Sequence, residues 1–347
     1  MKILAQKQGL ATAGNMPTGF KEVEGTRGES AYVFEMGDMY GALVQEGLGT
    51  KSLIARAVYE ETGKSFFAAI AQDTVASIIN DLISVGATPI VLNAYWSASS
   101  YEWLTHRKLA TDFIRGWRAA CDEAKVVWGG GETQSLSGVV LPGALELAGS
   151  AFGVIKFKEQ LVQGKNLRAG DAIVLLASSG VHANGISLIR DIAKRLPAGY
   201  QTKLNDGLRF GETVLTPTPI YARLIQELFE AGLDIHYLSN ITGHGWRKLM
   251  RAEPAFTYRL SNIPPVAEIF NFIAEQADND ESEMYGNYNM GAGYAVYLPA
   301  EQAHIVLKIA KLRGLRAWIA GKVEAGPKQV IIEPKHITFK ADSLEVR

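Results

Sequence analysis

The chain has 347 residues, of which 47% are hydrophobic and 20% charged, so it can bury a sizeable core and is not a disordered chain. Its 35 Lys and Arg residues nearly balance its 36 Asp and Glu residues, so no basic excess supports a nucleic-acid partner. Its one cysteine, Cys121, cannot form an intramolecular disulfide and fits a reducing compartment such as the cytoplasm.

Export and membrane insertion are not expected. Polar residues interrupt the apolar stretch within Met1–Lys7, so this segment does not resemble the apolar region of a signal peptide. Apolar runs such as Ala172–Ala177 are far shorter than the roughly 20 residues of a membrane-spanning helix. We therefore expect a cytoplasmic protein without a membrane partner.

Residues 1–30 lack apolar periodicity and are interpreted as an extended or mobile leader. Residues 31–160 are predicted to form an N-terminal domain of alternating strands and helices. Apolar side chains recur at helical spacing in two of its segments, and the second segment has Leu109, Phe113, Trp117 and Cys121 on one face. The other elements predicted here are strands at 31–34, 41–44 and 89–95 and a helix at 73–85.

The polar segment Lys156–Gly170 is the predicted boundary between domains, and residues 171–347 are predicted to form a C-terminal α/β domain. Thr218 and Pro219 are predicted to be the N-cap and first residue of a helix. The remaining elements predicted are helices from about 186 and near 265–276 and 299–313, and strands near 172–177, 291–298, 317–323 and 329–333.

Four common motifs of nucleotide-binding proteins and hydrolases are absent. A P-loop requires glycine directly before lysine and another glycine five positions earlier, and neither Lys51 nor Lys64 meets both conditions. There is also no G-x-G-x-x-G, G-x-S-x-G or H-E-x-x-H sequence. A Rossmann dehydrogenase, a serine hydrolase and a zincin are therefore unsupported.

The first candidate site follows a predicted strand. Its glycines would let the backbone approach an anion, its Thr-Lys pair can donate to phosphate, and its glutamate can hold a cation. These residues are Glu46, Gly47, Gly49, Thr50 and Lys51. A hairpin with a solvated lysine would show the same pattern, so both interpretations stay open.

Asp73, Asn80 and Asp81 are predicted to lie along one edge of a helix, because seven residues are close to two helical turns. Two carboxylates and an amide suit Mg²⁺, which binds through a few carboxylates, waters and substrate phosphates. An ordinary solvated helix face would carry the same residues.

Three consecutive glycines occur in Trp128–Thr133, after a strand-like pair of valines. Such a run loses backbone entropy on folding and indicates close approach to a ligand or a tight crossing between domains. In a ligand site, Gly130 and Gly131 would approach the ligand, and Glu132 would bind metal or accept a hydrogen bond from substrate.

Two further turns, at Ser178–Gly185 and Asn240–Gly245, each precede a predicted helix, where free backbone N–H groups can bind an anion. Their histidines, His182 and His244, could equally be turn residues bonded to the backbone. A sixth glycine turn, at Asn287–Gly293, is also compatible with simple entry into a strand.

The order of these turns is more specific than any one of them. Between about Glu46 and Val323 the chain contains, in order, E-G-x-G-T-K, N-D-L, G-G-E-T, S-S-G-x-H-x-N-G-x-S-L-x-R, T-P-T-x-I-Y, I-T-G-x-G and N-x-G-x-G. In this order the motifs closely resemble the aminoimidazole ribonucleotide synthetase family, also called phosphoribosylformylglycinamidine cyclo-ligase.

The resemblance implies a two-domain mixed α/β fold and a homodimer whose N-terminal sheets join into a barrel, with ATP bound in a cleft formed there. It also implies that ATP and Mg²⁺ activate the formyl amide oxygen of formylglycinamidine ribonucleotide as a phosphate ester. An amidine nitrogen then closes the imidazole ring, and ADP and phosphate leave. Such a site must neutralise triphosphate charge and hold the reacting groups together.

By motif match, the resemblance implies a role for each turn. The phosphate-binding residues would be Gly47, Gly49, Thr50 and Lys51, with Asn80, Gly130, Gly131 and Thr133 completing the nucleotide site. The metal ligands would be Glu46, Asp73, Asp81 and Glu132. The substrate side would hold Ser179, Gly180, Asn184, Gly185, Thr242 and Gly243. The catalytic residues would be Lys51, Asp81, Glu132 and His182.

Four residues depart from the family pattern. Glu46 and Asn93 stand where Asp is usual, and Asn240 and His244 replace His and Gly around I-T-G-G-G. The alternatives are another ATP-using enzyme of the superfamily, similar to thiamine-monophosphate kinase, and a nucleotide-binding paralogue without turnover. Selenophosphate synthetase and the hydrogenase-maturation protein are disfavoured, because they need an N-terminal and a C-terminal cysteine respectively.

Overall fold

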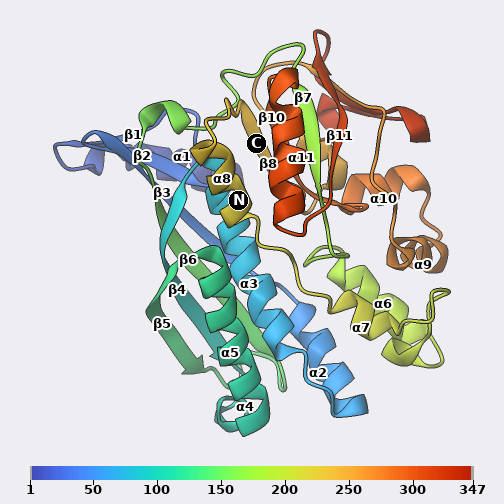
Figure 1. The fold of residues 1–347 in the computed structure, drawn as a ribbon. Coiled ribbons are helices and arrows are strands. Elements are labelled where there is room, and N and C mark those ends of the chain that lie inside the picture. The colour runs from blue at the N-terminus through green and yellow to red at the C-terminus, as the bar shows by residue number, and fades with distance from the viewer. Residues whose placement is uncertain (1, 345–347) are drawn as a thin grey trace.

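The computed structural model describes residues 2–344 and contains two β-sheets (Figure 1). The first sheet contains β1 (Phe20–Glu22), β2 (Tyr32–Met36), β3 (Met39–Gly47), β4 (Thr88–Ala98), β5 (Val127–Ser135) and β6 (Leu145–Ile155), in the order β1-β2-β3-β6-β4-β5. Its neighbouring strands are antiparallel except β4 and β5, which are parallel.

The second sheet contains β7 (Ala172–Ala177), β8 (Tyr237–Asn240), β9 (Thr257–Leu260), β10 (Ala292–Leu298), β11 (Ala317–Glu324), β12 (Gln329–Ile332) and β13 (Ile337–Lys340). Their order is β13-β12-β9-β11-β7-β10-β8, and only β9 and β12 are parallel. The predicted mixed α/β fold with two sheet-containing units is confirmed.

Helices pack beside both sheets. They are α1 (Lys2–Ala11), α2 (Lys51–Thr62), α3 (Phe67–Leu82), α4 (Tyr101–Thr105), α5 (Arg107–Ala124), α6 (Ile186–Arg195), α7 (Phe210–Val214), α8 (Ala222–Glu230), α9 (Glu268–Ala277), α10 (Glu281–Asn287) and α11 (Ala303–Leu312). None of the helices within the described residues is long and apolar enough to cross a membrane.

Helices α3 and α5 pack against each other, and α3 covers one face of the first sheet. Glycine on β6 lets α3 come close, because a Cβ at Gly149 would lie 2.8 Å from Ile78 Cδ1 and 2.6 Å from the Asn93 carbonyl oxygen. The opposite face, here called the open face, leaves Leu43 47% exposed and Tyr95 38% exposed. One side of this sheet therefore lacks a covering layer within a single chain.

The end of α3 connects the two units. It continues into a short 3₁₀ segment, Ile83–Val85, which contacts β8 of the second sheet. Ser84 Oγ lies 2.8 Å from the Tyr294 hydroxyl of β10. Figure 1 shows α3 between the first sheet and the second unit. A side chain on α3 can thus face residues from both halves of the chain.

The predicted elements are largely present, with three corrections. The leader is not extended throughout, because it contains α1 and the strand β1, which pairs with β2. Several elements are absent from the prediction, among them α2, α7, α10, β6, β9 and β13. The helix after Thr218 begins three residues later than Pro219, at Ala222, because the Thr218 side chain binds Asp73 instead of capping the helix.

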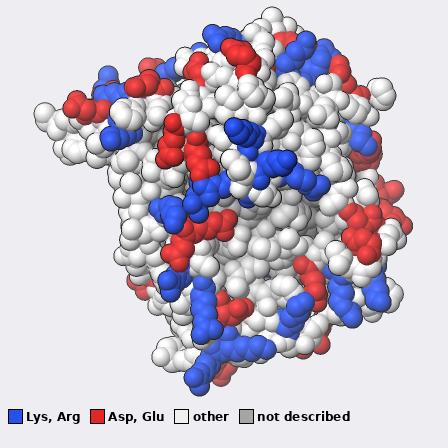
Figure 2. All heavy atoms as spheres, in the orientation of Figure 1, with Lys and Arg blue, Asp and Glu red and all other residues white. Residues whose placement is uncertain are grey.

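Charged side chains are mixed over the surface. On the face drawn in Figure 2, Lys and Arg alternate with Asp and Glu, and neither sign covers a large continuous area. This distribution agrees with the near-equal numbers of basic and acidic residues.

Candidate functional site

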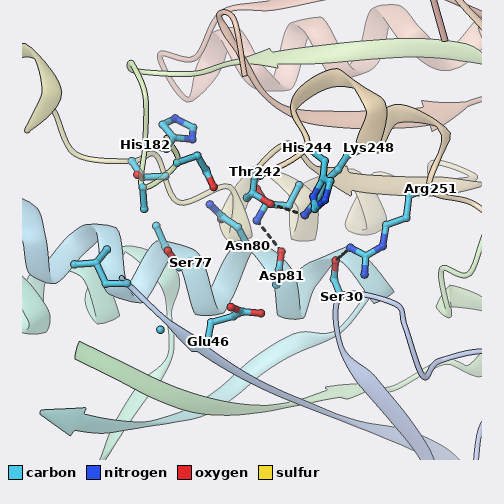
Figure 3. Close-up of a pocket in the computed structure, with 18 of the residues that line it drawn as sticks. Ser30, Glu46, Ser77, Asn80, Asp81, His182, Thr242, His244, Lys248 and Arg251 are labelled. Carbon is cyan, nitrogen blue, oxygen red and sulfur yellow. Dashed lines mark hydrogen bonds between the residues drawn. The ribbon is translucent and has the colours of Figure 1, made fainter. Parts of the chain in front are cut away.

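A cavity of about 350 Å³ lies between the two units (Figure 3). The first unit contributes the end of β3 and one side of α3. The second contributes the turns after β7 and β8. The lining residues are Glu29, Ser30, Glu46, Gly47, Leu48, Ala76, Ser77, Asn80, Asp81, His182, Ala183, Asn184, Thr218, Asn240, Thr242, Gly243, His244, Lys248 and Arg251. Many of the predicted site residues, far apart in sequence, thus meet in one cavity.

Two carboxyl groups face each other across this cavity. Asp81 comes from the last turn of α3, and Glu46 comes from the end of β3 (Figure 3). Burial, and then the neighbouring Asp81, raise the pKa of Glu46 to about 7. Within the described residues Glu46 has no hydrogen-bond partner, so its carboxyl remains available to a ligand.

The substitution at Asn240 is accommodated by Asp81. The Asn240 side-chain amide donates to Asp81 Oδ1 over 2.7 Å, and this hydrogen bond joins the end of β8 to α3. Asn240 is therefore a neutral donor that orients the Asp81 carboxylate and leaves its second oxygen facing the cavity.

Two cationic side chains form the far wall. Lys248 lies on the 3₁₀ segment Gly245–Met250, and its ammonium donates to Thr242 Oγ1. Burial lowers the pKa of Lys248, whereas the Asp81 and Glu46 carboxyls raise it. Arg251 donates to Ser30 Oγ over 2.8 Å and to the Gly28 carbonyl over 2.7 Å, so it fixes the segment that closes this end of the cavity.

Lys51 and Asp73 do not line the cavity, which corrects two predicted roles. Lys51 Nζ lies 2.6 Å from Asp73 Oδ2, and both side chains are 0% exposed. Asp73 Oδ1 accepts from Thr218 N over 2.9 Å and from Thr218 Oγ1 over 2.5 Å. Direct contact of Lys51 with phosphate, or of Asp73 with metal, does not fit this buried geometry.

Asn80 also has a structural role at the cavity wall. Its amide nitrogen donates to the Pro219 carbonyl over 2.9 Å, and its oxygen accepts from Tyr221 N over 3.0 Å. Asp73 and Asn80, two turns apart on α3, therefore bind the segment Thr218–Tyr221 with their polar atoms. The polar edge predicted for this helix exists, but it is buried rather than solvated.

His182 is buried in the turn after β7. Its Nε2 accepts from Ser179 N over 3.4 Å, which leaves the ring proton on Nδ1. Burial, followed by the charge of Lys51, lowers the pKa of His182 to about 3. His182 is therefore a neutral residue of the cavity wall at physiological pH.

A second cavity, of about 560 Å³, adjoins the first and shares Leu48, Asn184 and Gly243 with it. The N-terminal ends of α2 and α6 both open onto it through Thr50 and Gly185. Free N–H groups at a helix N-terminus favour an anion, so two such ends on one cavity suit a phosphate group. Gly49, a predicted phosphate-binding residue, also lines this cavity.

The remaining predicted residues lie outside both cavities. Ser179 donates to the Pro217 carbonyl over 2.7 Å, and the Gly180 carbonyl accepts from Asn289 over 2.7 Å, so both support the turn from behind. The residues Gly130, Gly131, Glu132 and Thr133 belong to β5 instead of a loop.

Strand packing explains two of the three consecutive glycines, Gly129 and Gly131, whereas Gly130 has a φ of +115° and open space where a Cβ would lie. A Cβ at Gly131 would lie 1.9 Å from the Ala94 carbonyl oxygen of β4, and one at Gly129 would lie 2.6 Å from Val91 Cγ2. The close approach predicted for a ligand is therefore an approach to the neighbouring strand. Glu132 is in register with Tyr95 on the open face, so in a single chain it is not near Asp81 or Glu46.

The predicted metal set is thus reduced to two acids. The described residues contain no group of three or more His, Cys, Asp or Glu that could hold a metal ion. Mg²⁺ commonly binds proteins through one or two carboxylates plus phosphate oxygens and waters. Glu46 and Asp81 together fit an ion of that kind. The pKa of Glu46 is raised, and its side chain has no hydrogen bond from the described residues.

Sequence reasoning missed several cavity residues, of which Glu29, Lys248 and Arg251 carry charge. A weak signal was present, because Lys248 lies three residues after Gly245 and next to the apolar residues Leu249 and Met250. Arg251 gave no comparable signal, since its partners Gly28 and Ser30 lie more than 200 positions earlier in the chain.

Comparison with known proteins matches both units to one family. Residues 28–155 match the N-terminal domain of AIR synthase related proteins, and residues 168–333 match their C-terminal domain. A phosphoribosylformylglycinamidine cyclo-ligase of Methanococcus maripaludis is 32% identical over 299 residues, covering 86% of this chain and 82% of the relative. One of Rippkaea orientalis is 33% identical over 325 residues, covering 90% and 91%.

Solved structures share the fold at low sequence identity. HypE in the HypE–HypF complex has a TM-score of 0.63 and 18% identity over 97% of this chain and 98% of that chain. AaThiL complexed with AMPPCP and TMP has a TM-score of 0.62 and 14% identity over 98% and 97%. At these identities the likeness shows the fold alone.

Proposed function

This chain belongs to the AIR synthase related protein family, and we propose that it is an ATP-dependent phosphoribosylformylglycinamidine cyclo-ligase of purine biosynthesis. It converts formylglycinamidine ribonucleotide to aminoimidazole ribonucleotide and releases ADP and phosphate. One observation carries this proposal: relatives with that activity in their names are about one-third identical over more than 80% of both chains.

The cavity chemistry supports an anionic substrate held with a cation. Glu46 and Asp81 would hold Mg²⁺, which supplies positive charge to phosphate oxygens when bound. The N-terminal ends of α2 and α6, at Thr50 and Gly185, provide N–H donors for phosphate. A binding site for an ATP analogue in the structurally similar AaThiL supports ATP as the phosphate donor.

Ring closure requires the reacting groups to be held close while water is kept out. Asn184, Thr242 and Gly243 line the side of the cavity opposite α3, so they are suited to contact the substrate. His182, being neutral, acts there as a hydrogen-bonding and shape-determining residue. Lys51 contributes by fixing the first turn of α2 against α3.

We also propose that the protein is a homodimer formed through the open face. Leu43 and Tyr95 are exposed there on adjoining parts of the first sheet, and an uncovered apolar sheet face is typical of a protein interface. Glu132 lies at the same face, in register with Tyr95, so pairing of two copies would bury it, whereas Thr133 is in register with Trp96 on the face that α5 covers. A cytoplasmic location remains a prediction from the single buried Cys121.

The decisive experiment measures ADP release with ATP, Mg²⁺ and formylglycinamidine ribonucleotide. The proposal expects ADP release that depends on this substrate, with aminoimidazole ribonucleotide as the product. Thiamine monophosphate in a parallel reaction tests the related kinase activity. ADP release with thiamine monophosphate alone would refute the cyclo-ligase assignment, and ATP binding without turnover on either substrate would favour a non-catalytic paralogue.

A further inference from the structure

The proposed reaction assigns no role to Lys248, although its side chain points into the cavity (Figure 3). The residue is 8% exposed, and Thr242 Oγ1 accepts a hydrogen bond from its ammonium. An ammonium has three N–H donors, and burying one beside a single neutral hydroxyl is unfavourable unless negative charge lies close.

That negative charge comes from the two carboxyl groups of the cavity. Asp81 and Glu46 both raise the pKa of Lys248 against the effect of burial, and Lys248 in turn lowers the pKa of Glu46. Asn240 holds Asp81 in position from the same wall, over 2.7 Å. Lys248, Asp81 and Glu46 therefore interact with one another, and Arg251 adds a second positive charge that lowers the pKa of both Lys248 and Glu46.

We propose that Lys248 is a specificity-determining residue: its ammonium is a built-in counter-ion of Glu46 and Asp81 and sets their affinity for a divalent cation. A metal ion and the ammonium compete for the same two carboxylates. Metal binding to the free protein is therefore weak, and it strengthens when a polyphosphate supplies the ammonium with another anionic partner. This inference concerns the same cavity as the proposed function. It rests on that function only for the location of the site.

A direct role of Lys248 in binding a substrate anion is the competing explanation. The two acids beside it argue against a role in anion binding alone, because an anion that arrives without a metal ion would have to approach two carboxylates as well as the ammonium. Removing the charge of Lys248 should raise the metal affinity of the nucleotide-free protein under the proposal and leave it unchanged under the competing explanation, so one measurement distinguishes them.

The test is a measurement of Mn²⁺ binding to the nucleotide-free protein, in which the electron paramagnetic resonance signal reports the free Mn²⁺. The titration is done at about pH 8, where Glu46 is largely ionised. Lys248→Met removes the charge and keeps the length of the side chain. We expect it to bind Mn²⁺ at least about tenfold more tightly than the wild type, because a competing positive charge has been removed at close range. Lys248→Arg, which keeps the charge, should stay within about threefold of the wild type.

Two controls make the result specific. Lys322→Met removes a surface lysine paired with Glu324 at 3.2 Å, outside the cavity, and should leave Mn²⁺ affinity unchanged. Adding Asp81→Asn to Lys248→Met should abolish the gain. If Lys248→Met does not fold by circular dichroism, Lys248→Gln replaces it in the same titration.

An affinity within about twofold of the wild type, or weaker, for the charge-removing variant overturns the proposal. Weaker binding of inorganic pyrophosphate with unchanged Mn²⁺ affinity would instead identify Lys248 as an anion ligand. Neither readout uses turnover, so a failed cyclo-ligase assay leaves this result interpretable, and the reverse also holds.

Discussion

Lys51 Nζ lies 2.6 Å from Asp73 Oδ2 in a position where neither side chain reaches solvent. The pair joins the first turn of α2 to the middle of α3, and Asp73 also accepts two hydrogen bonds from Thr218 of the second unit. A lysine after a glycine turn, which the sequence suggested as a phosphate ligand, is thus part of the frame behind the cavity.

Removing either member of this pair should be strongly destabilising. We expect Asp73→Asn or Lys51→Met to lower the free energy of unfolding by about 3–5 kcal/mol, because one buried charge loses its partner. Urea unfolding followed by tryptophan fluorescence measures the loss. Lys64→Met, which breaks a surface pair with Glu212, should cost less than about 1 kcal/mol, and similar losses for all three would contradict the buried-pair interpretation.

Asp81 should matter for turnover and little for folding. Asp81→Asn keeps an oxygen that can accept from Asn240 but removes the charge, so we expect turnover to fall at least about a hundredfold. The free energy of unfolding should fall by clearly less than for Asp73→Asn, because Asp81 borders a cavity and keeps its hydrogen bond from Asn240 after the substitution. Steady-state ADP release and urea unfolding provide the two values, with Asp122→Asn on the surface of α5 as the matched control. A folding loss as large as that of Asp73→Asn would mark Asp81 as structural.

Glu46 should make the metal-free protein less stable as pH rises. Its pKa is raised from 4.5 to about 7, so the folded protein holds this proton more tightly than the unfolded chain does. Ionisation therefore weakens the folded state, and stability should fall as pH rises from about 5 to about 8. Urea unfolding across this range, compared with Glu46→Gln, isolates the contribution. Parallel pH profiles for the two proteins would show that Glu46 does not titrate in this way.

His182 should remain neutral throughout the physiological range. Burial and Lys51 lower its pKa to about 3, whereas an unfolded histidine titrates near 6.5. The nitrogen chemical shifts of its ring should therefore stay constant from about pH 5 to about pH 8, with the proton on Nδ1. Exposed His304 provides an internal comparison within the same spectra. A titration of His182 near neutral pH would restore it as a candidate proton donor.

The homodimer can be tested at the open face. Leu43→Asp introduces a charge into the apolar surface of β3, where we expect the partner to pack, and it should shift the protein from dimer to monomer. Light scattering coupled to size exclusion measures the mass. Leu312→Asp on α11, at a position that is 78% exposed against 47% for Leu43, should leave the mass unchanged. A wild type that is monomeric at micromolar concentration would refute the proposed pairing.

The local pattern of apolar residues was sufficient to predict an element that has one regular apolar face. The four-residue spacing from Leu109 to Cys121 predicted α5 because every one of those side chains is buried. Helix α2 was missed for the opposite reason. Its buried side includes Lys51 and Ser52, which interrupt the apolar period and resemble solvated positions in sequence.

The site was only partly predictable, because several of its residues act through distant partners. Motif order identified Glu46, Asp81, Thr242 and Gly243, which do line the cavity. It could not show that Asp73 is paired with Lys51 and Thr218, since Thr218 lies 145 positions away. Nor could it show that Gly131 is small to admit the Ala94 backbone instead of a ligand.

The segment Thr218–Tyr221 is held by Asp73 and Asn80 although it belongs to the other half of the chain. Substitutions in either half of the chain would disturb this wall of the cavity unless both halves changed together. Divergence toward a new substrate would therefore accumulate on the loop side, at Asn184, Asn240 and His244. Two of those three positions are where this chain already departs from its family's motifs.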